Sequence, residues 1–195
     1  MDLQQALVEL QKRGLQDYAA LLFASQVRRE PFLAPLKYGL AYYDFLREHR
    51  VKSVLEVGSF HGMTAILAAL AGAEVISIDI SPFQQELAKY LTGDCFRILW
   101  IAADSREILP LIASRRVEAV LVDGAHDVST ARADIREALR VARRFVLVHD
   151  TDNPKTPSVR AVLLQEIKEP WQVKVELPHS QAPWGLTILE KAGGS

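Results

Sequence analysis

Cysteine is nearly absent from this chain, since Cys95 is the single cysteine among 195 residues. One cysteine excludes an internal disulfide and a metal cage built from cysteines. The sequence also lacks any apolar run near the roughly 20 residues that a helix needs to cross a bilayer. Its first residues, Met-Asp-Leu-Gln-Gln, lack the basic segment and apolar core of a secretory signal. We therefore expect a cytoplasmic protein without a membrane partner.

An excess of charge of either sign is missing as well. Lys and Arg number 23 against 24 Asp and Glu, which leaves a formal net charge of -1. This balance favours neither nucleic acid nor an anionic membrane as a partner. With 49% hydrophobic residues, a chain of this length is typical of one globular domain with a substantial core.

What the sequence does contain is a regular alternation of two patterns after residue 50. Apolar runs of strand length occur at 53–57, 74–79, 96–102, 118–122 and 144–148. Helical patterns lie between them, at 63–70, 83–91, 105–114 and 128–142. Strands that are apolar throughout and alternate with helices indicate a parallel sheet covered on both faces. With right-handed crossovers, the sequence predicts an α/β, Rossmann-like, doubly wound fold.

Both ends of the chain depart from this alternation. Residues 1–50 predict an N-terminal helical extension, which could pack on the core, cover a site or form a homodimer contact. Near the other end, a helix at 156–168 precedes apolar runs at 172–177 and 185–190. Too few residues separate these two runs for a helical crossover, so they should pair antiparallel. We predict a mostly parallel seven-stranded sheet closed by this hairpin, with the main domain at 51–192 and a single domain overall.

The first predicted strand runs into a loop with the spacing Glu-x-Gly-x-x-x-Gly, formed by Glu56, Gly58 and Gly62. Glycines at these positions allow a ligand to approach the backbone. The spacing differs from the Gly-x-Gly-x-x-Gly of dinucleotide sites, and Phe60 stands where a close-packing glycine is expected there. The loop is therefore a candidate nucleotide site, but one that disfavours a dinucleotide-dependent oxidoreductase.

An acidic residue lies at or just after the end of each of five predicted strands. In open parallel sheets, ligands bind beyond the carboxyl ends of the strands. Asp residues also cap helices and start turns, so Asp104 could be a cap and Asp79 a turn residue. As a set they predict one polar site, and its members are Glu56, Asp79, Asp104, Asp123 and Asp150.

The glycine loop and this acidic edge resemble class I S-adenosylmethionine (SAM)-dependent methyltransferases. The resemblance implies that Asp79 accepts hydrogen bonds from the ribose, Asp104 accepts one from the adenine amino group, and Glu56 lies near the amino-acid end. Asp79 follows Glu56 by 23 residues, about where a doubly wound fold places its ribose carboxylate. The cofactor-binding residues implied in this way are Glu56, Gly58, Ser59, Phe60, Gly62, Asp79, Asp104 and Asp123.

The segment Leu121-Val-Asp-Gly-Ala-His126 narrows the resemblance to small O-methyltransferases of sugars and natural products, over about residues 50–150. It implies that Asp123 and His126 are catalytic, with His126 as general base. It also implies that Asp123, Asp150 and His149 hold Mg²⁺ or another divalent cation, which would lower the pKa of a hydroxyl.

Two of these residues have open alternatives. His149 stands where related proteins often have Glu, so the site would suit a softer ion, or His149 could bond to backbone instead. His126 could be a structural cap in the turn after its strand. We predict a SAM-dependent enzyme that methylates a small hydroxylated acceptor. The alternative is a SAM-binding accessory module with the same fold and no turnover.

Overall fold

The computed structural model describes residues 8, 12, 33–60, 62–82, 86, 97–178, 180–182 and 184–193. Seven strands form one sheet in the order β3-β2-β1-β4-β5-β7-β6. Their bounds are β1 Ser53–Val57, β2 Glu74–Asp79, β3 Ile98–Ala102, β4 Val117–Val122, β5 Ala142–His149, β6 Trp171–Leu177 and β7 Leu186–Lys191. The first five strands are parallel, and β7 pairs antiparallel with both β5 and β6. The predicted Rossmann-like sheet with its C-terminal hairpin is confirmed.

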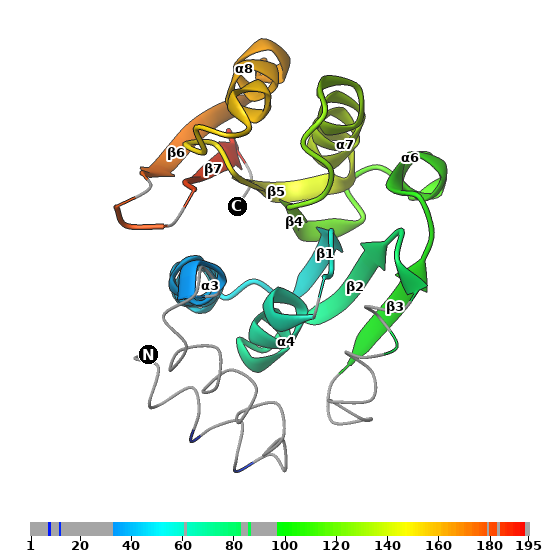
Figure 1. Ribbon diagram of the computed structural model, residues 1–195. Coiled ribbons are helices and arrows are strands. Elements are labelled where there is room, and N and C mark those ends of the chain that lie inside the picture. Colours follow the sequence, from blue (N-terminus) through cyan, green and yellow to red (C-terminus); the bar gives the residue numbers. More distant parts are fainter. Residues whose placement is uncertain are drawn as a thin grey trace.

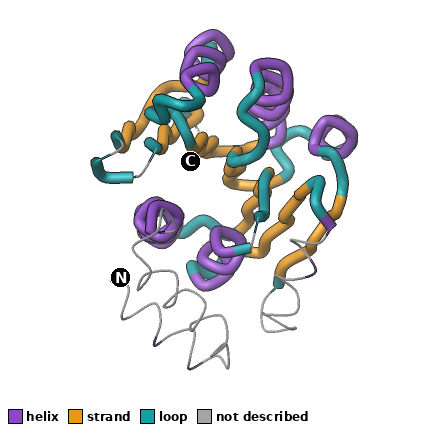
Figure 2. Tube along the Cα trace, viewed as in Figure 1, coloured by secondary structure: helices purple, strands orange, loops and turns teal. Residues whose placement is uncertain are grey.

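Helices cover both faces of this sheet (Figures 1 and 2). Helices α3 (Leu33–Glu48) and α4 (Met63–Leu70) lie on one face, and α7 (Val128–Val141) and α8 (Pro157–Glu166) lie on the other. Successive residues of a strand point to opposite faces. Along β4, Leu121 therefore packs in the core under α3 and α4, while Val120 packs in the core under α7 and α8. Such two-sided burial explains why the central strands are apolar throughout.

The predicted helix at 105–114 is shorter in the structure. Helix α6 covers Ser105–Ile108 and continues as a single 3₁₀ turn, η1, over Leu109–Leu111. Pro110 lies in that turn, and a proline has no backbone N–H with which to continue an α-helix. The element therefore ends a few residues before its predicted end.

Helix α3 is the described part of the predicted N-terminal extension, and it packs on the core. Tyr38, Tyr42 and Leu46 are almost fully buried in the core that α3 shares with β1, β4 and β5. Before α3, only residues 8 and 12 of the predicted extension are described, and of the helix predicted at 83–91 only Glu86 is described. The homodimer contact stays a prediction. Among the described residues, no helix has the length and apolar character needed to span a bilayer.

Candidate active site

The ends of β1 and β4 meet at Gly58, which has a φ of 92°. The backbone N–H of Gly58 donates to the carbonyl of Ile78, and that of Asp123 donates to the carbonyl of Val57, each over 2.8 Å. A Cβ atom at Gly58 would lie 2.0 Å from the Asp123 carbonyl oxygen. Gly58 is therefore needed both for its backbone conformation and for the close approach of the loop after β4.

A cavity of about 600 Å³ opens beyond the carboxyl ends of β1, β2, β3 and β4. This volume is typical of small-molecule sites. Of the predicted cofactor-binding residues, the cavity is lined by Gly58, Phe60, Asp79, Asp104 and Asp123. The structure thus brings together five residues that are spread over more than sixty positions of the sequence, at the edge of the sheet where doubly wound folds bind ligands.

Asp79 is held in place by two backbone groups. The N–H of Phe60 donates to its Oδ2 over 2.9 Å, and the N–H of Ser81 donates to its Oδ1 over 2.8 Å. The second contact is the local one expected of a turn residue. Asp79 therefore shapes the turn after β2 and also lines the cavity, so the two interpretations of this residue are compatible.

Asp104 lines the cavity, but its carboxylate is already engaged. It is the N-cap of α6, where it accepts from the backbone N–H of Arg106, and it forms an ion pair with the guanidinium of the same residue. These hydrogen bonds hold the pKa of Asp104 low, at about 2. Of the two interpretations of Asp104, the structure therefore shows the helix cap. An adenine amino group would have to share this carboxylate with Arg106.

Glu56, Ser59 and Gly62 do not line the cavity. Glu56 is fully buried and accepts hydrogen bonds from the hydroxyls of Thr64 and Ser77, and the Ser77 oxygen lies 2.6 Å from the Ser59 oxygen. Burial raises the pKa of Glu56 to about 7, although the two hydroxyl donors act in the opposite direction. Gly62, at a φ of 75°, is the N-cap residue of α4. In this structure these residues support the loop from within.

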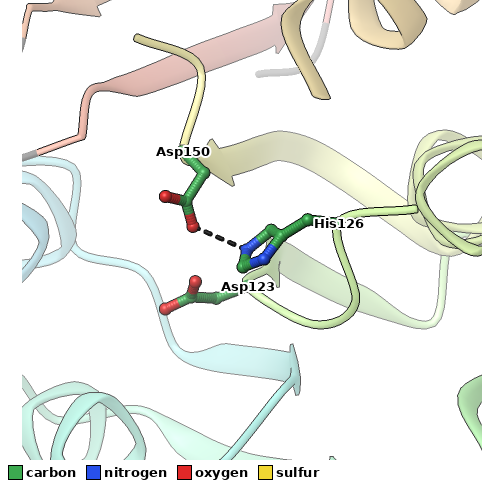
Figure 3. A group of neighbouring side chains, drawn as sticks. All are labelled: Asp123, His126 and Asp150. Carbon is green, nitrogen blue, oxygen red and sulfur yellow. Dashed lines mark ion pairs between the residues drawn. The ribbon is translucent and has the colours of Figure 1, made fainter. Parts of the chain in front are cut away.

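The side chains of Asp123, His126 and Asp150 converge, as Figure 3 shows, and Asp123 also lines the cavity. Asp123 and Asp150 directly follow the neighbouring strands β4 and β5, and His126 lies in the loop before α7. His126 Nε2 is 2.7 Å from Asp150 Oδ2. One ligand atom from each of the three residues lies within 4.8 Å of the others. Two carboxylates and an imidazole this close together can take up a proton or hold a divalent cation.

Several contacts fix this group. The carbonyl of His126 accepts a hydrogen bond from the Ser158 hydroxyl on α8, and the Asn153 side chain donates to Asp150. The hydrogen bond with Asp150 raises the pKa of His126, whose side chain is 41% exposed. Burial would raise the pKa of Asp150, but the hydrogen bonds from His126 and His149 hold it well below its usual range. Asp150 is therefore a buried carboxylate that carries its charge next to two imidazoles.

His149 lies outside the three-residue group, and its role as a metal ligand stays a prediction. Its side chain is buried, and its Nδ1 lies 2.9 Å from Asp123 Oδ1 and 3.2 Å from Asp150 Oδ2. Burial would lower the pKa of His149, but the two carboxylates outweigh this effect and raise it. This nitrogen already bonds to the carboxylates that would hold an ion. His126 is the third member of the group, together with Asp123 and Asp150.

Sequence reasoning missed two polar residues of the site. Tyr38 of α3 donates from its hydroxyl to Asp123 Oδ2 over 2.7 Å. Asp134 of α7 is buried in the cavity wall and accepts from the Ser105 hydroxyl over 2.7 Å. Both occupy ordinary core-facing helix positions, so the helical periodicity carries no sign of their polar contacts. Only the position of each helix on the sheet shows that they reach the site.

Comparisons with known proteins agree with this geometry. Residues 55–151 match a family model described as "Methyltransferase domain". No curated protein matches the chain. Cofactor-bound Rv0187 from MTB is similar in structure, with a TM-score of 0.69 and 20% identity over 89% of this chain and 88% of that one.

Two further structures are O-methyltransferases. TomG from Streptomyces achromogenes, involved in tomaymycin synthesis and in complex with SAM, has a TM-score of 0.64 and 17% identity over 80% of this chain and 79% of its own. The enzyme from Bacillus cereus in complex with SAH has a TM-score of 0.65 and 14% identity over 91% and 90%. At these identities the likenesses show a shared fold.

The matched residues 55–151 therefore form a methyltransferase domain, and the sheet has the class I, SAM-dependent methyltransferase fold. The segment that belongs to the methyltransferase domain family runs from β1 to the residue after Asp150. It therefore contains the glycine loop, the whole cavity lining and all three residues of the Asp123, His126 and Asp150 group.

Proposed function

We propose that this methyltransferase transfers the methyl group of SAM to a hydroxyl of a small acceptor. The observation that carries the proposal is the group of Asp123, His126 and Asp150 beside the cavity. Methyl transfer to a hydroxyl needs a base, because a neutral alcohol is a weak nucleophile and its proton must leave. A histidine paired with a carboxylate supplies one.

The cavity suits the cofactor. SAM carries a sulfonium and an ammonium against one carboxylate, so its net charge is positive near neutral pH. Five of the six charged residues in the lining are acidic, and they are Asp79, Asp104, Asp123, Asp127 and Asp134, against the single base Arg106. A cavity of this sign attracts a cationic ligand. Asp79, fixed by the Phe60 and Ser81 amides, is placed to accept from the ribose.

The reaction is an in-line displacement. The acceptor oxygen forms a bond to the methyl carbon, and the carbon–sulfur bond breaks with its electron pair left on sulfur. His126 takes the acceptor proton, while Asp150 orients the imidazole and stabilises the imidazolium that results. The enzyme otherwise contributes by holding the two reactants in line and excluding water.

The donor set also fits a divalent cation. Asp123 and Asp150 would hold it by their carboxylates, which hard ions such as Mg²⁺ prefer. Such an ion would supply Lewis acidity that lowers the pKa of the acceptor hydroxyl. The proton still leaves to His126. In this assignment the carboxylates of Asp123 and Asp150 bind the ion, and His126 accepts the proton of the acceptor hydroxyl.

The test is release of S-adenosylhomocysteine from SAM with a panel of catechols, phenols and sugars, for the wild type and His126→Gln. We expect the wild type to turn over at least one acceptor class and the variant to lose about 10²- to 10⁴-fold in kcat. The affinity for SAM should be unchanged, since His126 does not line the cavity. Unchanged kcat in the variant would contradict the role of His126, and an accessory module would bind SAM without any turnover.

Treatment with EDTA forms a second arm of this experiment. Loss of activity that Mg²⁺ or Mn²⁺ restores would support a cation on Asp123 and Asp150. Full activity after EDTA would remove the cation from the reaction and leave the pair of His126 and Asp150 as its only base.

A further inference from the structure

Tyr38 contacts the active site from a helix that precedes the matched methyltransferase domain. Its side chain is 2% exposed, and its hydroxyl donates to Asp123 Oδ2 over 2.7 Å. Its ring also stacks on the imidazole of His149, with centroids 3.8 Å apart and planes inclined by 16°. One buried side chain thus holds both a carboxylate of the catalytic group and the histidine next to it.

A continuous series of short contacts leads from Tyr38 to His126. Tyr38 holds Oδ2 of Asp123, and His149 Nδ1 lies 2.9 Å from the other oxygen, Oδ1. The same nitrogen is 3.2 Å from Asp150 Oδ2, which in turn is 2.7 Å from His126 Nε2. A carboxylate held at both oxygens cannot rotate freely about its terminal bond. The orientation of Asp123 therefore depends on Tyr38 as much as on His149.

We propose that Tyr38 is a positioning residue of the active site: it fixes the Asp123 carboxylate and, through His149 and Asp150, the ring of His126. The inference rests on the proposed function in one respect, namely that Asp123 and Asp150 hold the cation. Groups that orient metal ligands from outside the coordination sphere are worth about 10- to 100-fold in metal affinity. Helix α3 is then part of the catalytic apparatus as well as of the core.

Tyr42 offers a matched control on the same helix. It lies one turn further along, is fully buried, and its hydroxyl has no hydrogen-bond partner among the residues that the structure describes. Tyr38→Phe and Tyr42→Phe each remove one buried oxygen and keep the ring. Only the first removes a hydrogen bond, so a difference between the variants reports the bond to Asp123 and not the loss of a buried hydroxyl.

The first measurement is calorimetric titration of each purified protein with Mn²⁺ alone. We expect Tyr38→Phe to bind Mn²⁺ about 10- to 100-fold more weakly than the wild type, and Tyr42→Phe to bind it equally well. Equal affinity in all three proteins would overturn the proposal. A wild type that does not bind Mn²⁺ would contradict the cation in the proposed function, and the second measurement would then decide about Tyr38.

The second measurement records the histidine ring nitrogens of ¹⁵N-labelled protein at one pH, with signals assigned from His126→Gln and His149→Gln. We expect Tyr38→Phe to shift the signals of both His149 and His126, and Tyr42→Phe to shift neither. A shift of His149 alone would overturn the proposal, because a change in ring stacking would explain it. A spectrum identical to that of the wild type would do so as well.

If the Tyr38→Phe protein does not fold, tyrosine-labelled protein gives the same information. With ¹³C at the tyrosine Cζ, Asp123→Asn should move the Tyr38 signal, because the hydroxyl then donates to a neutral amide instead of a carboxylate. The Tyr42 signal, assigned from Tyr42→Phe, should stay in place. A Tyr38 signal that does not respond would overturn the proposal.

Discussion

Substitution of Gly58 by alanine tests the packing between the glycine loop and the loop after β4. Gly58 has a φ of 92°, which costs an L-residue about 1–2 kcal/mol. The added Cβ would also lie 2.0 Å from the Asp123 carbonyl oxygen, a backbone atom that cannot rotate away. Overpacking of this kind costs about 1–3 kcal/mol. We therefore expect Gly58→Ala to lose about 2–5 kcal/mol of unfolding free energy, as the sum of the two effects.

Gly72 separates these two contributions. It has a φ of 99°, but a Cβ there would meet only the end of the Lys52 side chain, at 3.9 Å. Gly72→Ala should therefore show the conformational cost alone, about 1–2 kcal/mol. Urea denaturation of both variants measures the difference. Equal losses in the two variants would refute the steric argument and imply that the Asp123 loop moves aside at little cost.

Two further predictions concern the carboxylates of the glycine loop and cavity. The pKa of Glu56 rises from 4.5 to about 7 in the folded state, so the folded protein keeps a proton that the unfolded chain releases between these pH values. The contribution of Glu56 to stability is therefore largest below pH 4.5 and falls by about 3 kcal/mol as pH rises to 7. The difference in unfolding free energy between wild type and Glu56→Gln, measured in urea, should change by this amount over that range. A constant difference would contradict the burial argument. Asp79→Asn should weaken S-adenosylhomocysteine binding by about 10- to 100-fold in calorimetry, since a charged acceptor for the ribose becomes neutral. An unchanged Kd would exclude Asp79 from the ribose site.

The elements of the fold were predictable because their signals are local. Strands β1 and β2 have the predicted bounds, and the hairpin of β6 and β7 follows from the short connection between them. The break between α6 and η1 was missed, although Pro110 was visible in the sequence. The periodicity of the flanking apolar residues concealed it, because a 3₁₀ turn and an α-helix place such residues at similar spacing.

The candidate site was predictable in its location but not in its contacts. The rule that ligands bind at the carboxyl ends of parallel strands placed Asp79, Asp104 and Asp123 at one edge, and all three line the cavity. The rule does not predict whether each carboxylate faces a bound ligand or another side chain of the protein. Arg106 pairs with Asp104, and hydroxyls surround Glu56 inside the core.

By itself, the sequence determined the order of strands and helices along the chain and which strands run parallel or antiparallel. It also determined that acidic residues gather at one edge of the sheet. These properties follow from side-chain periodicity and connection length, which act over a few residues. The tertiary structure alone decided that Tyr38 bonds to Asp123, 85 positions away, and that ligand atoms of His126, Asp123 and Asp150 lie within 4.8 Å of one another. Such contacts depend on how a helix sits on the sheet and which rotamer each side chain adopts, and no local pattern encodes either.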